Sequence, residues 1–331
     1  MNATTTLLLS RADVERLLTP DDCIAAVEDA FRRHALGEIP APGILGMHVE
    51  DGSFHVKAAQ MTLDRRYFAA KLNANFPANA PRHGLPTIQG VLVLSDASNG
   101  TPLAVMDSMA LTALRTAAGS AVAAKYLSRE GSTTALICGC GGQASAQLAA
   151  LARVRRLERV AVYDHDSGRA AAFAASSQRA LDMKVVQATE LASAVGEADI
   201  VVTCTTARRF FIAREMVRPG TFVSAVGADN EMKQEIDPQL LAAGTVVTDL
   251  TEQCSAIGDL HHAIAQGVMT AEDVHAQLGD VVAGLAPGRS GDGEIVVFDS
   301  TGTALQDVAA AAAVYRRAID CGEGVRFSFS R

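Results

Sequence analysis

The chain has 331 residues, 49% of them hydrophobic, with a mean hydropathy of +0.16, so it is long enough to bury two substantial cores. Lysine and arginine together number 29 against 37 aspartates and glutamates, and the net charge of -8 disfavours nucleic acid as a partner. Because no run reaches the ~18 apolar residues of a membrane span and the first residues lack a basic signal-peptide start, we expect a cytoplasmic protein with no membrane partner.

The first part of the chain is predicted to form a helix followed by strands. Thr19 suits a helix N-cap and Pro20 the first helical turn, and Gly37 ends the helical periodicity that begins there. Between residues 39 and 105, short apolar runs alternate with turn residues, which predicts an antiparallel meander of strands. An alanine-rich helix over residues 109–127, opened by Asp107-Ser108, is expected next.

A glycine-rich turn then separates an apolar run from an Ala/Leu-rich segment. The pattern Gly139-x-Gly141-x-x-Ala144 between a strand and a helix is typical of a dinucleotide site. Gly139 lets the chain turn, and Gly141 together with Gly142 lets backbone N–H groups approach a pyrophosphate at the helix N-terminus. A glycine turn without a ligand is the alternative interpretation, but the strand and helix on either side favour the cofactor.

The choice between NADH and NADPH is predicted from the end of the next strand. Asp164 ends the run 159–164, where its carboxylate would accept hydrogen bonds from the ribose hydroxyls and repel a 2′-phosphate. His165 and Asp166 provide no arginine at the usual place, although Arg169 is one helical turn away. We therefore expect NADH to be preferred, with NADPH possible.

Beyond the glycine turn, strands and helices alternate to about residue 302. This alternation predicts an α/β fold with a parallel sheet covered by helices on both faces, that is, a Rossmann-type NAD(P)-binding domain over residues 119–302. The alanine-rich helix after Thr303 is expected to return to the first domain. That first domain, an α+β strand-rich unit, would then comprise residues 1–118 and 303–331.

Three charged residues stand in apolar surroundings and are candidates for the chemistry. Lys71 lies within an apolar strand, Arg115 within an alanine-rich helix, and Asp229 directly after a predicted strand and the pair Gly227-Ala228. By pattern alone each is more often a paired structural charge than a catalytic group. His261-His262 lacks a third ligand at metal spacing, and the six cysteines show no C-x-x-C, so no metal is predicted.

Segments along most of the chain resemble the ornithine cyclodeaminase/mu-crystallin family. The matching segments include residues 71–79, 84–90, 100–104, 106–112, Arg115-Thr116, Gly139-x-Gly141-x-Gln143-Ala144, Pro219-Gly220, Gly227-Ala228-Asp229, 233–237 and 300–307. They follow one another in the family's order. The resemblance implies a homodimer built through the strand-rich domain, which would also bind the substrate, and NAD(P) bound by the Rossmann-type domain.

The resemblance also implies roles for individual residues. Lys71 is similar to the family's lysine for the substrate carboxylate, Arg115 to the arginine near that carboxylate and the cofactor, and Asp229 to the catalytic aspartate beside the substrate nitrogen. Thr301 resembles a residue beside the substrate. The positions that resemble cofactor contacts are Thr87, Arg115, Gly139, Gly141, Gly142, Gln143, Asp164, Thr206, Gly227, Lys233 and Ser300.

Two departures from the family pattern bear on the reaction. Gly43 stands where cyclodeaminases carry an arginine, and His55 near where they carry a glutamate. Lys57 shares a strand face with His55 and could replace the missing arginine's charge. The sequence Phe-His-Val-Lys at 54–57 resembles the branch that reduces cyclic ketimines, so both His55 and Lys57 are candidate substrate contacts, although a packed, hydrogen-bonded histidine is the commoner case.

The expected function is therefore the NAD(P)H-dependent reduction of small cyclic ketimines, Δ1-pyrroline-2-carboxylate and Δ1-piperideine-2-carboxylate, to L-proline and L-pipecolate. Ornithine cyclodeaminase and linear amino-acid dehydrogenase are the alternative enzymes. A crystallin-like protein that binds a nicotinamide cofactor without catalysis is the alternative from another class, and the joint presence of Lys71, Arg115 and Asp229 disfavours it.

Overall fold

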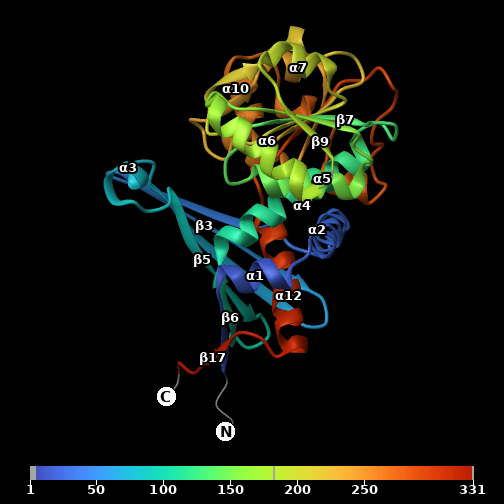
Figure 1. Cartoon of the computed structure of the whole chain (residues 1–331). Helices are drawn as coiled ribbons and strands as arrows, with labels where there is room; N and C mark the ends of the chain where they lie inside the picture. The colour runs from blue at the N-terminus through green and yellow to red at the C-terminus, as the bar shows by residue number, and fades with distance from the viewer. Residues whose placement is uncertain (1–4, 182, 330–331) are drawn as a thin grey trace. The chain divides into compact units, whose positions relative to one another are not determined.

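The computed structural model describes residues 5–181 and 183–329, which divide into two compact units (Figure 1). Unit 1 comprises residues 1–115 and 303–331, so the chain leaves it and later returns; unit 2 comprises residues 116–302. Helix α4 (Ser108–Leu127) contains the point at which the chain passes from unit 1 to unit 2. The assignment of substrate binding to one unit and cofactor binding to the other stays a prediction.

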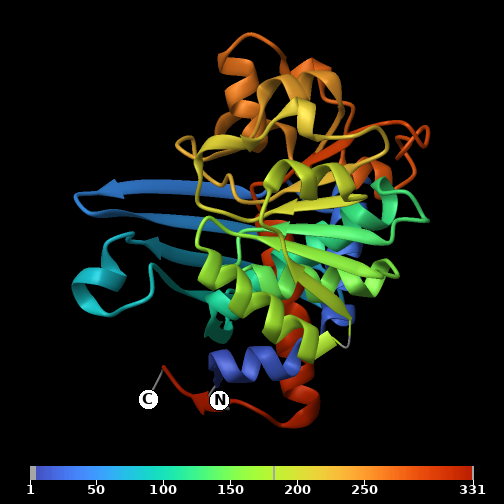
Figure 2. The ribbon, with the colours of Figure 1, turned by 45° about the horizontal axis from the view of Figure 1, so that its top comes forward.

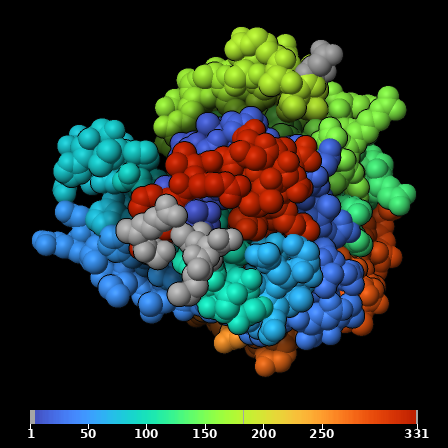
Figure 3. All heavy atoms as spheres, turned by 90° about the horizontal axis from the view of Figure 1, so that it is seen from below, coloured from blue at the N-terminus to red at the C-terminus, as the bar shows by residue number. Residues whose placement is uncertain are grey.

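Unit 1 is built on an antiparallel meander in which each strand from β2 to β6 pairs with the next. Beyond β6, β1 joins in parallel, and β17 closes that edge antiparallel to β1. Figure 3 shows the C-terminal segment lying beside the N-terminal one, as this pairing requires. The elements are β1 (Thr6–Leu9), α1 (Arg11–Leu17), α2 (Pro20–Ala35), β2 (Gly43–Val49), β3 (Gly52–Thr62), β4 (Arg66–Asn75), α3 (Asn79–His83), β5 (Ile88–Asp96), β6 (Pro102–Asp107), α12 (Ala304–Cys321) and β17 (Val325–Phe327).

One face of this sheet is covered by α12. Lys57 pairs in register with Lys71, and Lys71 pairs with Leu92, so the three side chains share that face. Helix α12 packs against β3, β4 and β5, and its Asp307 reaches Lys71. The covered face therefore combines apolar packing with buried charge.

The other face of the sheet exposes apolar side chains. The residues in register there are Leu45, Val56, Leu72 and Val91, from β2, β3, β4 and β5. Leu45 is 59% exposed, Leu72 42% and Val91 45%. Figure 2 shows the β2–β3 hairpin extending from the rest of unit 1. Such a contiguous apolar surface is typical of an interaction site.

Unit 2 is an α/β fold with a parallel sheet, as the alternating pattern predicts. Its strand order is β15-β14-β16-β12-β10-β7-β8-β9, with a separate parallel pair β11–β13. The elements are β7 (Thr134–Cys138), α5 (Ala144–Val154), β8 (Arg159–Tyr163), α6 (Ser167–Leu181), β9 (Lys184–Gln187), α7 (Leu191–Glu197), β10 (Ile200–Thr203), β11 (Arg208–Ile212), β12 (Phe222–Ala225), β13 (Gln234–Ile236), α8 (Pro238–Ala243), β14 (Thr245–Thr248), α9 (Thr251–Ile257), α10 (Asp259–Ala265), β15 (Ala276–Gln277), α11 (Leu278–Val282) and β16 (Val296–Asp299).

The order of these strands places a switch point beside the glycine-rich turn. Strand β7 is followed on one side by β8 and β9 and on the other by β10 and β12, so the chain direction across the sheet reverses between β7 and β10. In open α/β sheets, ligands bind outside the carboxyl ends of the strands at such a point. The strands themselves are buried apolar runs, including Leu136, Val201 and Val223, which pack into a continuous core.

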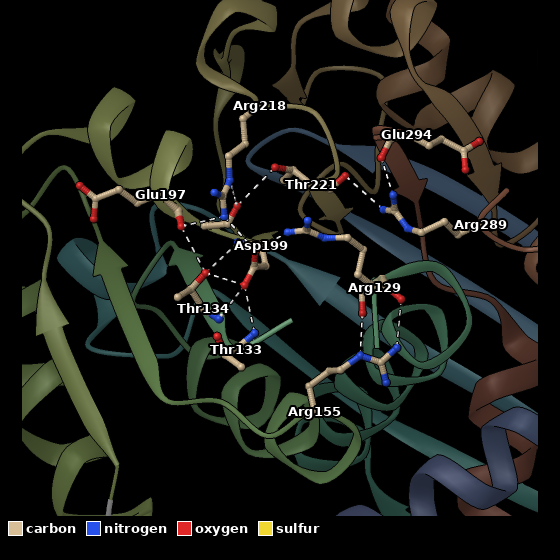
Figure 4. A network of polar contacts seen from close by, with 12 residues as sticks. Arg129, Thr133, Thr134, Arg155, Glu197, Asp199, Arg218, Thr221, Arg289 and Glu294 are labelled. Carbon is tan, nitrogen blue, oxygen red and sulfur yellow. Dashed lines mark hydrogen bonds and ion pairs between the residues drawn. The ribbon is translucent and has the colours of Figure 1, made fainter. Parts of the chain in front are cut away.

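The opposite, amino-terminal edge of the same sheet is held by Asp199 (Figure 4). Its carboxylate accepts hydrogen bonds from the Thr133 and Thr134 backbone N–H groups at 3.0 and 3.1 Å. It also pairs with Arg129 at 2.5 Å and Arg218 at 2.8 Å. Although burial opposes it, these hydrogen bonds and Arg129 lower the pKa of Asp199. We interpret this network as structural because it joins the starts of strands.

Most long elements confirm the sequence predictions. Helix α2 begins at Pro20 after the N-cap Thr19, and α4 begins at Ser108, with Asp107 accepting a hydrogen bond from the Ala110 N–H at 2.8 Å. The terminal strands β1 and β17 and the pair β11–β13 were not predicted. They are defined by their pairing, β1 with β6 and β17, and β11 with β13 outside the main sheet of unit 2. Among the described residues, no helix is both long and apolar enough to cross a bilayer.

Candidate active site

Unit 1 buries a group of charged side chains on the covered face of its sheet, which we call the cation cluster: Lys57, Lys71, Arg115 and Asp307. Lys71 Nζ donates to Asp307 Oδ1 at 2.9 Å and to Thr112 Oγ1 at 3.3 Å. Arg115 Nε lies 2.9 Å from the same Asp307 oxygen. Lys71 is 3% exposed, Arg115 4% and Asp307 1%. Two cations therefore contact the same oxygen of a buried carboxylate, and the charge of Lys57 also acts on it.

The cation cluster contains more cationic than anionic side chains. Burial, reinforced by the neighbouring Arg115 and Lys57, lowers the pKa of Lys71 to about 7 even though Asp307 acts in the opposite direction. The pKa of Asp307 is lowered by Arg115 and Lys71 despite the opposing effect of burial. Three cationic side chains thus stand beside one carboxylate, an arrangement that favours a second, bound carboxylate.

Hydrogen bonding in the cluster is also incomplete within the described part of the chain. Gln306 Oε1 accepts from Arg115 Nη1 at 2.9 Å and from the Thr303 N–H at 3.0 Å. The other oxygen of Asp307, Oδ2, and the Gln306 amide nitrogen are buried without a hydrogen-bond partner there. Buried polar atoms of this kind mark a site that a polar ligand or water completes.

The residues near the two family departures lie on β2 and β3. Gly43 begins β2, and His55 is opposite Gly46 and Asn73 in the sheet register. His55 Nε2 lies 3.0 Å from Ser53 Oγ, so the histidine is hydrogen-bonded on its own strand. Lys57, two residues further along, is 9% exposed and belongs to the cation cluster. His55 and Lys57 therefore share a face, and Lys57 alone is buried beside Lys71.

The glycine-rich turn has the geometry expected of an anion site. Gly139 has φ +95°, and a Cβ there would lie 2.8 Å from Thr205 Cγ2, so both conformation and space require glycine. At Gly141 and Gly142 a Cβ would meet nothing within 4 Å. Helix α5, eleven residues long, follows with no side-chain cap at Gln143 and no acidic residue in its first turn. An open helix N-terminus with a small, accessible turn suits a phosphate group.

A second observation at this turn points to a polar ligand. Gln143 Oε1 is buried and has no hydrogen-bond partner among the residues that the structure describes. Asp164, at the end of β8, accepts a hydrogen bond from the Cys140 N–H at 2.8 Å and another from the Asp166 N–H at 2.9 Å. The Asp164 carboxylate therefore fixes the turn. Its Oδ1 also lies 3.1 Å from His165 Nδ1, so Oδ2 is the oxygen with a lone pair left for a ligand hydroxyl.

Asp229 lies in the loop after β12. Its Oδ1 pairs with Lys233 Nζ at 2.6 Å, and its side chain is 47% exposed. The start of this loop is anchored because the Gly227 N–H donates to Glu235 Oε2 at 2.8 Å. The other Glu235 oxygen accepts from the N–H and the hydroxyl of Thr205, both at 2.7 Å. A single buried glutamate thus ties the loops after β10 and β12, which carry Thr206 and Asp229.

Ser300 and Thr301 follow β16 and are buried. Ser300 Oγ donates to Asp249 Oδ2 at 2.8 Å, and Thr301 Oγ1 accepts from Gln253 Nε2 at 2.5 Å. Both hydroxyls thus have partners in unit 2. Thr87 lies in unit 1 just before β5, where its carbonyl accepts from the Phe76 N–H at 2.8 Å.

Within unit 2, the predicted residues lie at the carboxyl ends of neighbouring parallel strands β7, β8, β10, β12 and β16. Beneath them is a second buried group, which we call the acid cluster: Glu235, Asp249, Asp259 and Asp299. Sequence reasoning missed this cluster, and it also missed Asp307 and Gln306. Asp307 was visible only as the end of a matching segment, and no local pattern indicated that it pairs with Lys71.

No group of three or more His, Cys, Asp or Glu side chains in the described residues is arranged to hold a metal ion. His262 Nε2 lies 2.8 Å from the Lys233 carbonyl, and His261 Nδ1 lies 3.3 Å from the Ser255 carbonyl. Both histidines are therefore hydrogen-bonded to backbone carbonyls of unit 2.

Comparison with known proteins decides the family. The family model described as the ornithine cyclodeaminase/mu-crystallin family matches residues 4–322. The chain belongs to this family. Alanine dehydrogenase of Archaeoglobus fulgidus is 38% identical to it, over 98% of this chain and 99% of that protein. The family resemblance predicted from the sequence is thereby confirmed.

Solved structures of family members share the fold. An archaeal alanine dehydrogenase dimer with bound NAD has a TM-score of 0.94 and 38% identity, covering 98% of this chain and 100% of that one. Δ1-pyrroline-2-carboxylate reductase of Thermococcus litoralis, in complex with NADH and L-proline, has a TM-score of 0.90 and 32% identity, covering 97% and 99%. The predicted α/β fold class is confirmed.

Proposed function

We propose that this protein is an NAD-dependent oxidoreductase that reduces the C=N bond of a small α-imino acid. Cyclic ketimines, Δ1-pyrroline-2-carboxylate and Δ1-piperideine-2-carboxylate, are the proposed substrates, and L-proline and L-pipecolate the products. The observation that carries the proposal is the cation cluster of unit 1, in which Lys71 and Arg115 both pair with Asp307 and the charge of Lys57 also acts on Lys71.

The cation cluster would bind the carboxylate of the substrate. Arg115 would supply a fixed charge, and Lys71 and Lys57 would donate further charge-assisted hydrogen bonds, each worth ~1.5–3 kcal/mol. A compact substrate suits this arrangement because the cations are held by the sheet and by α12. The position of Gly43, where cyclodeaminases carry an arginine, supports reduction rather than ring closure with loss of ammonia.

The glycine-rich turn of unit 2 would bind the pyrophosphate of NAD through backbone N–H groups at the start of α5. Asp164 would accept hydrogen bonds from the ribose, and Thr87, Arg115, Gln143, Thr206, Gly227, Lys233 and Ser300 are the further proposed contacts. When bound, the reduced nicotinamide would supply the hydride to the C=N carbon. Asp229 would stabilise the positive charge of the iminium nitrogen, and Thr301 would lie beside the substrate.

A linear amino-acid dehydrogenase is the second candidate. It is favoured by the 38% identity to the alanine dehydrogenase of Archaeoglobus fulgidus over nearly the whole chain. The two candidates share the reduction of an imine next to a carboxylate and differ in how the imine arises. In the second case it forms from a 2-oxo acid and ammonia on the enzyme.

A panel of substrates distinguishes the candidates. Oxidation of NADH, and separately of NADPH, is followed with the five- and six-membered ketimines and with pyruvate plus ammonia, while ammonia release is followed with L-ornithine. We expect kcat/KM to be highest for a ketimine with NADH. Faster turnover of pyruvate and ammonia would favour the dehydrogenase, and faster ornithine deamination the cyclodeaminase. A folded protein that binds NADH and turns over none of these would contradict the proposal.

We further propose that the protein is a homodimer. The support is the exposed apolar row Leu45, Val56, Leu72 and Val91 on the open face of the unit 1 sheet, together with the dimeric state of the archaeal alanine dehydrogenase. Molar mass from light scattering should equal twice that of the 34.5 kDa chain. Leu72→Glu should lower it toward the monomer, whereas Glu215→Gln, at an exposed position of unit 2, should leave the mass unchanged.

A further inference from the structure

The cation cluster contains a lysine that would lose its charge without its carboxylate neighbour. Two neighbouring cations repel the positive charge of Lys71. They are Arg115 on α4 and Lys57, which lies opposite Lys71 on β3. It faces an uncharged Leu92 on β5 and the Thr112 hydroxyl on α4. The neighbouring α2 contributes Cys23, whose pKa burial raises to about 12, so that it stays an uncharged thiol. Asp307 on α12 therefore supplies the negative charge beside Lys71.

We propose that Asp307 keeps the Lys71 ammonium protonated near neutral pH and thereby sets the pH range over which the cluster binds a substrate carboxylate. The statement about the pH range of substrate binding rests on the proposed function, whereas the protonation of Lys71 by Asp307 does not. Asp307 acts through Lys71 and Arg115, so it is a positioning residue.

The contacts of Asp307 with Lys71 and Arg115 support this role. Its Oδ1 lies 2.9 Å from both Lys71 Nζ and Arg115 Nε, and all three side chains are at most 5% exposed, so solvent screens the interaction weakly. A carboxylate within 4–6 Å favours the charged form of a neighbouring group by ~1–3 pH units. The pKa of Lys71 is about 7 with Asp307 in place, so loss of that carboxylate would leave the lysine neutral at pH 7.

The arrangement also explains why this carboxylate does not displace the substrate. Asp307 uses Oδ1 for both cations, and Oδ2 has no hydrogen-bond partner in the described residues. Single-oxygen contacts leave further N–H donors on Lys71 and Arg115 for a second carboxylate. Asp307 therefore maintains the charge without occupying the donors needed for binding.

A direct test is the titration of Lys71 by NMR in protein labelled at the lysine 13Cε and 15Nζ positions. The chain has five lysines, Lys57, Lys71, Lys125, Lys184 and Lys233, so Lys71→Arg assigns the signal. In Asp307→Asn the Lys71 titration should move to lower pH by at least about one pH unit. Asp320→Asn, an exposed carboxylate on the same helix, should leave it unchanged. A Lys71 titration that is the same in Asp307→Asn and in the wild type would overturn the proposal.

Asp307→Asn alone leaves the buried cations without their carboxylate, which destabilises the cluster, so a second pair of variants keeps the test decisive. Lys57→Gln removes one cation, and Lys57→Gln with Asp307→Asn preserves the net charge of the wild type. Lys71 should again titrate at least about one pH unit lower in the double variant than in Lys57→Gln. Equal titrations in this pair would also overturn the proposal.

The pH dependence of KM for the ketimine completes the test. In the wild type KM should rise as pH increases through about 7, and in Asp307→Asn the same rise should occur at lower pH by the amount seen by NMR. If the NMR titration moves and KM does not follow, Asp307 controls Lys71 but the substrate carboxylate binds elsewhere. That outcome would reject the proposed function and retain the protonation of Lys71 by Asp307.

Discussion

The cation cluster of unit 1 and the acid cluster of unit 2 are both almost fully buried, but they satisfy their charges differently. In the acid cluster, Asp259 Oδ1 accepts from the Glu235 and Ile236 N–H groups at 2.7 and 2.9 Å, and Asp299 Oδ2 accepts from the Leu260 N–H at 2.9 Å. Burial is the largest influence that raises the pKa values of Glu235, Asp259 and Asp299, that of Asp299 to about 7. These carboxyl groups can neutralise themselves by binding protons.

In the cation cluster the proton moves the other way: burial, Arg115 and Lys57 lower the pKa of Lys71 to about 7, while Asp307 pairs with both Lys71 and Arg115. A bound carboxylate would add a second anion beside the cluster's three cationic side chains. Buried charge alone therefore does not identify a functional site. Backbone donors and bound protons can neutralise most of the acid cluster, whereas the excess of cationic side chains in the cation cluster suits the proposed binding of a carboxylate.

The largest effect is expected at Asp229, which belongs to neither cluster although Glu235 anchors its loop. Asp229→Asn keeps the shape and removes the charge, so kcat should fall by roughly 10²–10³-fold with little change in NADH affinity or thermal stability. Steady-state kinetics and NADH titration check this. A folded variant that reduces the ketimine within about threefold of the wild type would show that Asp229 is not catalytic.

A smaller effect is expected at Lys71, where charge should act on binding. Lys71→Met removes one charge-assisted hydrogen bond to the substrate carboxylate in both the ground and transition states, so KM should rise by ~10–150-fold with kcat nearly unchanged. Lys125→Met, at an exposed position of unit 2, serves as the control. A fall in kcat at unchanged KM would place Lys71 in the chemistry rather than in binding.

The smallest effects should appear in the pH dependence of stability, with opposite signs for the two clusters. The pKa of Lys71 is about 7 in the folded protein and 10.5 when unfolded, so between these values only the unfolded state holds the proton and stability should rise with pH. The pKa of Asp299 is raised from 3.8 to about 7, so over that range only the folded state holds the proton and stability should fall as pH rises.

Denaturant unfolding of two variants separates these contributions. Lys71→Met should lack the gain in stability above pH 7, and Asp259→Asn, which stays neutral beside Asp299, should show less loss between about pH 4 and 7. Asn retains an acceptor for the Glu235 and Ile236 N–H groups, so its fold should be preserved. If the free energy of unfolding of both variants changes with pH as it does in the wild type, these clusters do not control the pH dependence of stability.

The sequence allowed prediction of features that local patterns determine. The periodicity of α2 and α4, the meander of unit 1 and the alternation in unit 2 each follow from residues close in the chain. Lys71, Arg115 and Asp229 were found because charges in apolar runs are unusual and because the family resemblance gave them roles. The chemical roles of these residues stay predictions until they are measured.

Other features depend on contacts between distant segments, and no local pattern contains them. Asp307 lies in the first turn of an alanine-rich helix, where acidic residues are common, but the fold buries it against Lys71. Glu235 and Asp259 likewise meet only because β13 and α10 pack together. Strand β17 is three residues long and is defined by its pairing with β1 rather than by its own sequence.

The return of the chain to unit 1 has a consequence for biosynthesis. The ribosome releases Lys71 and Arg115 with the first segment, then all of unit 2, and only afterwards the helix that carries Asp307. Until α12 arrives, the nascent first segment carries its cations without their carboxylate and without the helix that covers them. Unit 2 is continuous in sequence and can therefore fold first, so the cation cluster is completed late in translation.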